Sequence, residues 1–141
     1  VDDWSTGVQR RVEHGTTDIA FSPAVIASSE LGYRFWDRPA RGSVELTLIT
    51  KYVGRQYLDN TSSTDRMLHP YLVNELRANI TWLLKGTKGI DLNLTVRNLF
   101  SEMYESNGWA YSYFENDRRK AMIGLFPQAP LNVLGGVSVR F

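Results

Sequence analysis

The last stretch of the chain, residues 131–141, alternates with a period of two. Its odd positions are apolar or small, and its even positions carry most of the polar atoms. Such alternation over about ten residues is what a transmembrane β-strand requires, with one face toward lipid and the other toward a wet lumen. A half-buried strand that closes a soluble β-sandwich shows the same pattern, because alternation alone does not identify the solvent.

Four earlier segments repeat this alternation and predict strands at residues 24–36, 43–58, 71–84 and 90–100. The sequence therefore predicts an all-β fold, an antiparallel meander of about five long strands. Short Gly-containing turns are expected at residues 37–42 and 85–89. Residues 1–22 predict a loop with a short hairpin around Gly15, and residues 59–70 and 101–130 predict long loops.

Composition excludes several classes of protein. The 141 residues contain no cysteine, so a disulfide framework and a thiolate metal site are both excluded. Sixteen basic residues against 15 acidic ones give a net charge of +1, which argues against a nucleic-acid-binding surface. No window approaches 18 uninterrupted apolar residues, so no transmembrane helix is predicted. Because the chain opens on Val1, we expect it to be a piece of a longer protein.

The spacing of the turns and the placement of the aromatic residues favour the membrane interpretation. Connections run long, short, long, short, long, which is the layout of outer-membrane barrels with short turns on one side and longer loops on the other. Large aromatic residues gather next to the short turns, as at a membrane interface. They are Tyr33, Phe35, Trp36, Trp82 and Phe141.

Several segments resemble one family. Asn98, Leu99 and Phe100, followed by Tyr104, resemble the penultimate-strand signature of TonB-dependent outer-membrane receptors. Residues 19–35 and 51–66 are also similar to this family, in particular to receptors of Bacteroidetes-type bacteria. Residues 126–141 fit its closing strand.

The resemblance implies that residues 1–141 form the C-terminal part of a large transmembrane β-barrel of about 22 strands, without the plug and the earlier strands. It also implies an energy-coupled uptake receptor of the bacterial outer membrane for a siderophore, glycan or similar ligand. Its expected partners are outer-membrane lipid, the rest of the barrel and the plug, the inner-membrane energy-coupling complex and the outer-membrane assembly machinery. No cofactor is implied. The alternative is a soluble all-β ligand-binding module.

Candidate site residues fall into two groups. Aromatic and basic residues of the last outer loop suit stacking on a ligand, although packing of the loop or an aromatic belt is the favoured explanation: Trp109, Tyr111, Tyr113, Phe114, Arg118 and Arg119. By the resemblance, the terminal strand carries the assembly signal: Val137, Val139 and Phe141. His14 and His69 lie in different loops without a partner at ligand spacing, so no metal site is predicted. No catalytic set is found, which predicts that the chain is not an enzyme.

The charged residues of the strands are expected on the lumen face. Their alternation opposite the apolar residues favours cross-strand ion pairs in a wet interior over a docking surface for a plug. They are Glu45, Lys51, Arg55, Glu75, Arg77, Asp91 and Arg97.

Overall fold

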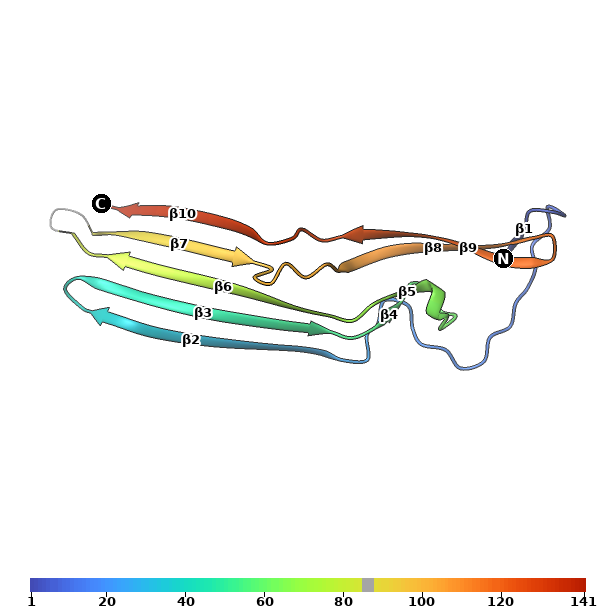
Figure 1. The fold of residues 1–141 in the computed structure, drawn as a ribbon, viewed down its shortest axis with the longest axis horizontal. Coiled ribbons are helices and arrows are strands. Elements are labelled where there is room, and N and C mark those ends of the chain that lie inside the picture. The colour runs from blue at the N-terminus through green and yellow to red at the C-terminus, as the bar shows by residue number, and fades with distance from the viewer. Residues whose placement is uncertain (85–87) are drawn as a thin grey trace. The chain divides into compact units, whose positions relative to one another are not determined.

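A computed structural model describes residues 1–84 and 88–141, and they form antiparallel sheets with almost no helix (Figure 1). The ten strands of these residues are β1 (Asp2–Asp3), β2 (Ile26–Arg38), β3 (Gly42–Val53), β4 (Gln56–Tyr57), β5 (Met67–Leu68), β6 (Tyr71–Trp82), β7 (Gly89–Arg97), β8 (Glu105–Glu115), β9 (Arg118–Pro127) and β10 (Asn132–Arg140). A single 3-10 turn, η1 (Thr64–Arg66), lies between β4 and β5. The all-β prediction is confirmed.

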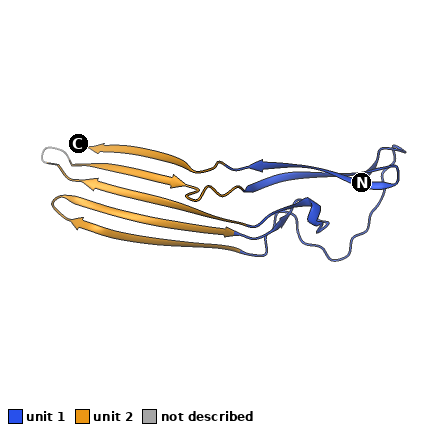
Figure 2. Ribbon diagram, in the orientation of Figure 1, with its two compact units in different colours: residues 1–25, 53–70, 104–128 blue, residues 26–52, 71–103, 129–141 orange. Residues whose placement is uncertain are grey.

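The chain divides into two compact units (Figure 2). Unit 1 comprises Val1–Val25, Val53–Pro70 and Tyr104–Gln128. Unit 2 comprises Ile26–Tyr52, Tyr71–Met103 and Ala129–Phe141.

Unit 2 contains one five-stranded sheet in the order β10-β7-β6-β3-β2, whose neighbouring strands run in opposite directions (Figure 1). These five strands are the five that the alternation predicts. Two ends differ from the prediction by three residues or more. The strand from residue 43 ends at Val53, before Gly54, and β7 ends at Arg97 because Asn98 has a left-handed backbone with φ of 49°. Of the turn predicted at residues 85–89, residues 85–87 lie outside the described part.

Unit 1 corrects the prediction of a long loop at residues 101–130. β8 and β9 form an antiparallel hairpin in which Glu115 pairs with Arg118 and Gly108 with Leu125. Asn116 and Asp117 connect the strands with φ of 51° and 61°, the left-handed conformations that a two-residue hairpin turn requires. Asn and Asp tolerate these conformations better than other side chains, so the turn forms without glycine.

The N-terminal segment of unit 1 also differs from its prediction. The turn forms at Gly7, not at Gly15: Gly7 has φ of 71° and its amide donates to the Asp3 carbonyl at 2.8 Å. An isolated bridge joins Asp2 to Gln9, and β1 then pairs in parallel with β8, with Asp2 opposite Tyr113. No strand is assigned around Gly15.

The buried apolar side chains of unit 1 come from β4, β5 and the residues beside them. Leu68, Val53 and Leu58 are almost fully buried. β4 pairs with β5, and Gly108 of β8 lies against Leu58, where a larger side chain would not fit. Apolar burial in unit 1 therefore joins three segments that are far apart in sequence.

Gly42 provides a test of the β3–β6 pairing in unit 2. Its φ is 124°, and a β-carbon at this position would overlap the carbonyl of Thr81. We expect Gly42→Ala to lower the free energy of unfolding by about 1–3 kcal/mol, because the strands must separate or the backbone must strain. Denaturant unfolding followed by tryptophan fluorescence measures the change. Gly136→Ala is the control, since nothing lies within 4 Å of its β-carbon position. Equal losses in the two variants would contradict the close approach.

Candidate functional site

The register of β6, β7 and β10 separates apolar from polar side chains. Residues directly opposite each other lie on the same face of a sheet. Three such rows are apolar or small across all three strands: Val137–Leu92–Ile80, Val139–Ile90–Trp82 and Gly135–Leu94–Ala78. The rows between them are polar: Ser138–Asp91–Thr81 and Gly136–Asn93–Asn79. The sheet is therefore amphipathic, as the alternation predicts.

The apolar face of this sheet is not covered by other described residues. Val137 is 70% exposed, Leu94 is 46% exposed, and Leu31 at the other edge is 71% exposed. In a soluble sandwich such side chains would lie against a second layer. The structure thus shows one sheet layer with an open apolar face.

Ion pairs and polar hydrogen bonds occupy the opposite face. Asp91 lies 2.9 Å from Arg140 and accepts a hydrogen bond from Thr81 at 2.8 Å. Arg34 bonds Glu45 at 2.8 Å across β2 and β3. Because these side chains are partly solvent-exposed, each pair contributes little to stability. They make a polar surface, and Glu45 and Asp91 lie on it, as the alternation predicts.

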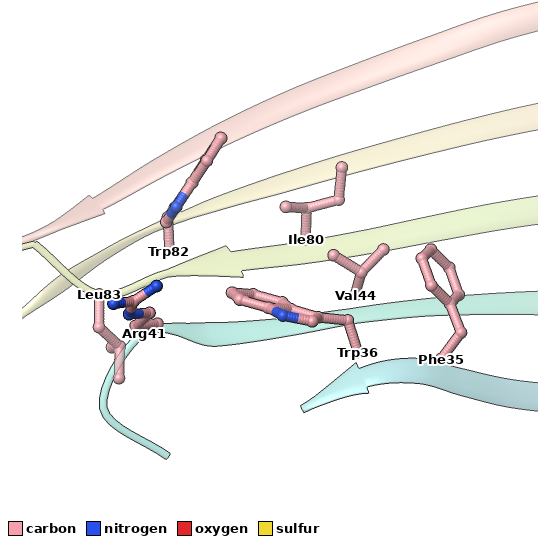
Figure 3. Close-up of a pocket in the computed structure, with 7 residues that line it drawn as sticks. All are labelled: Phe35, Trp36, Arg41, Val44, Ile80, Trp82 and Leu83. Atoms are coloured by element: carbon pink, nitrogen blue, oxygen red, sulfur yellow. The ribbon is translucent and has the colours of Figure 1, made fainter. Parts of the chain in front are cut away.

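Aromatic side chains gather around a cavity of ≈700 Å³ at the end of β2 and β6 (Figure 3). Phe35, Trp36 and Trp82 line it together with Arg41. These three rings belong to the aromatic group predicted beside the short turns, and Figure 3 shows them on strands β2 and β6. An apolar cavity with indole rings and one cation suits the boundary between water and hydrocarbon.

In unit 1 the hairpin divides the predicted binding residues between its two faces. Trp109, Tyr111 and Tyr113 alternate along one face of β8, whereas Phe114 and its partner Arg119 lie on the other. Arg118 is opposite Glu115, beside the turn. The six residues are in strands, not in a loop. Because they lie on both faces of the hairpin, they do not form one contiguous cluster.

Trp4 completes the aromatic group, and sequence reasoning missed it. Its ring stacks on Tyr113 with centroids 3.9 Å apart, and Tyr111 lies 6.2 Å from it. Parallel pairing of β1 with β8 brings Trp4 here across more than a hundred residues, and no local pattern signals such a pairing. The rings pack on one another, while Trp4 and Trp109 keep about half of their surface exposed, at 53% and 46%.

A hydrogen bond fixes the same group to β1. The Tyr111 hydroxyl donates to the Asp2 carboxylate at 2.6 Å. This bond raises the pKa of Tyr111, and it lowers the pKa of Asp2, to which Gln9 also donates.

The residues that resemble the family signature are divided between the two units: Asn98, Leu99 and Phe100 follow β7 in unit 2, and Tyr104 lies in unit 1. The Asn98 amide donates to the carbonyls of Glu102 and Ala129 at 2.9 and 3.0 Å, and its side-chain oxygen accepts from the Glu102 amide at 2.9 Å. Asn98 is 7% exposed. Its side chain thus joins the end of β7 to the segment that begins β10. Phe100, by contrast, is 73% exposed.

The terminal strand leaves the predicted assembly residues accessible. Val137, Val139 and Phe141 are exposed, and Phe141 retains 85% of its surface. β10 is an edge of the sheet, so its outer backbone groups are available for strand addition.

Among the described residues, no group of three or more His, Cys, Asp or Glu side chains is arranged to hold a metal ion. Within the same residues, no helix has both the length and the apolar character needed to cross a membrane.

Comparisons of the chain with protein-family models, with curated proteins and with solved structures found no match.

The role of Asn98 can be tested with two substitutions. Asn98→Ala removes three hydrogen bonds at a buried site and leaves two carbonyls and an amide without partners. We expect it to lower the free energy of unfolding by about 1–3 kcal/mol. Asn98→Gly loses the same bonds but adopts the positive φ without strain, so it should be less destabilised than Asn98→Ala. Denaturant unfolding compares them. Wild-type stability in both variants would contradict the role assigned to this side chain.

Proposed function

We propose that this chain is the C-terminal part of an outer-membrane β-barrel of the TonB-dependent receptor type, a nutrient uptake receptor. The observation that carries the proposal is the one-layer sheet of unit 2, with an exposed apolar face and a charged, hydrogen-bonded opposite face. In a large barrel, the first face contacts lipid and the second lines a wet lumen.

The exposed apolar face favours a lipid environment on energetic grounds. Burying one Val or Leu side chain contributes about 1.5–3 kcal/mol, and Leu94 and Val137 are only two of the exposed members. In water, a contiguous patch of this kind promotes aggregation. Contact with hydrocarbon removes these side chains from water, so no second protein layer is needed to cover them.

The two edges of the sheet would need further strands to pair with in a membrane. The strand order places β2 and β10 at opposite edges, and among the described strands they do not pair with each other. Unpaired backbone groups in hydrocarbon cost several kcal/mol each. The rest of the receptor barrel would pair with these edges.

The remaining partners are those that the family resemblance implies. A plug would contact the polar face, where Asn79 lies opposite Asn93 and Thr81 opposite Asp91. Coupling to an inner-membrane complex would use parts of the receptor other than this chain. The aromatic cavity with Phe35, Trp36 and Trp82 would lie at one bilayer interface, and the exposed Phe141 would be read by the assembly machinery. A siderophore, glycan or similar ligand would bind from outside.

A pair of neighbouring substitutions tests the membrane assignment. Leu94 and Asn93 are adjacent on β7 and point to opposite faces. Leu94→Arg should weaken folding into lipid vesicles by about 2–4 kcal/mol, because it places a charge in hydrocarbon. Asn93→Arg should have little effect, because it faces the lumen. Each variant is unfolded with increasing denaturant in lipid vesicles, and protease protection measures the folded fraction. The two curves give the change in folding free energy for each arginine.

Two outcomes would contradict the proposal. Equal tolerance of both arginines would mean that the Leu94 face does not contact lipid. A monodisperse wild-type monomer that needs no detergent would favour the alternative, a soluble all-β ligand-binding module.

A further inference from the structure

A cavity of ≈530 Å³ lies in unit 1, on the face of the hairpin that carries Arg119. Ser112 and Arg119 of the hairpin line one side, and Asp59 and Thr61 line another. A volume of this size is in the range of small-molecule sites. Every lining residue belongs to unit 1, whereas the proposed membrane function is argued from the sheet of unit 2. The inference therefore does not depend on that function.

Polar side chains around Asp59 make one wall of the cavity. Arg66 is 6% exposed, and its Nε lies 2.7 Å from the Asp59 carboxylate. Thr61 accepts a hydrogen bond from Arg66 and donates one to Asp59. The only carboxylate lining the cavity is therefore neutralised by its own partner, and this wall is held in place before any ligand binds.

The facing wall contains two buried polar atoms without partners. Arg119 Nε and Ser112 Oγ are both buried and have no hydrogen-bond partner among the described residues. The register explains why they are close: Arg119 pairs with Phe114 and Ser112 with Ala121, so the two are diagonal neighbours on one face. A buried guanidinium N–H and a hydroxyl without acceptors are costly unless a ligand or water supplies them.

The other cations of the cavity already have partners. Arg10 lies 2.5 Å from both Asp3 and Asp117, and Arg11 lies 3.2 Å from Glu13. Arg119 has no ion pair among the described residues. With Arg10, Arg11 and Asp59 each paired, Arg119 supplies the unmet positive charge of the cavity among the described residues.

We propose that this cavity binds a small oxyanion, a molecule that carries a phosphate or carboxylate group, through Arg119 and Ser112. A guanidinium presents a planar fork of N–H donors that matches two oxygens of either group. The Ser112 hydroxyl donates a further bond. His14, which also lines the cavity, lies beside the same space. The hydrogen-bonded Asp59–Arg66 wall leaves no free carboxylate to repel the anion.

The adjoining cavity, ≈510 Å³, shares His14, Thr61 and Arg119 with the first. It is also lined by Asp65, whose exposed carboxylate has no ion pair among the described residues. This second cavity, on the other side of the shared residues, leaves room for the remainder of a molecule larger than the anionic group.

Direct titration of the full chain in an uncharged, phosphate-free detergent tests the proposal. Inorganic phosphate and citrate are the two probes, at constant ionic strength, with binding measured by calorimetry. We expect saturable binding of at least one probe, and the stronger probe identifies the anionic group. Arg119→Gln should weaken that binding about tenfold or more, since a charged hydrogen bond is lost. Ser112→Ala should weaken it by a smaller factor.

Arg118→Gln is the matched control, because it removes the same charge from the neighbouring residue on the opposite face. It should leave the affinity unchanged. Arg119→Lys keeps the charge without the fork and should retain intermediate affinity, which provides a second test if Arg119→Gln does not fold. Absence of saturable binding to both probes would overturn the proposal, as would equal weakening by Arg118→Gln and Arg119→Gln.

Discussion

The register of the β6–β7–β10 ladder is the constraint on which the rest of unit 2 depends. Because successive side chains alternate between faces, a shift of one residue would move Leu92 and Leu94 to the polar side and Asp91 to the apolar side. The observed register instead places Leu92 between Ile80 and Val137, and Asp91 between Thr81 and Ser138. One set of backbone hydrogen bonds thereby produces both an apolar face and a face crossed by ion pairs.

Unit 1 is organised by different interactions. Its buried apolar residues come from short strands, and its hairpin is fixed by stacking of Trp4 on Tyr113 and by the bond from Tyr111 to Asp2. The other hairpin face meets the Asp59–Arg66 wall with Arg119 uncompensated. The sequence analysis predicted one binding group from the aromatic residues and Arg119. In the structure they serve separate purposes: the rings attach β1 to the hairpin, and Arg119 faces a cavity.

Period-two alternation was sufficient to predict the five strands of unit 2, because that pattern is local. The same alternation is present in β8 at Trp109, Tyr111 and Tyr113, and the Asn116–Asp117 turn is a second local signal of the hairpin. The contribution of Trp4 could not be predicted, since parallel pairing of β1 with β8 leaves no mark on either segment alone. The buried role of Asn98 likewise depends on the Ala129 carbonyl, which the chain brings back 31 residues later.

Site-directed spin labelling of β7 in lipid bilayers tests the membrane assignment of unit 2 most directly. The chain has no cysteine, so each single substitution from residue 90 to 96 gives one label site. Accessibility to oxygen should peak at Ile90, Leu92, Leu94 and Val96, and accessibility to a water-soluble nickel chelate should peak at Asp91, Asn93 and Thr95. Uniform access of the nickel chelate to all seven positions, or an alternation of the opposite phase, would contradict the account.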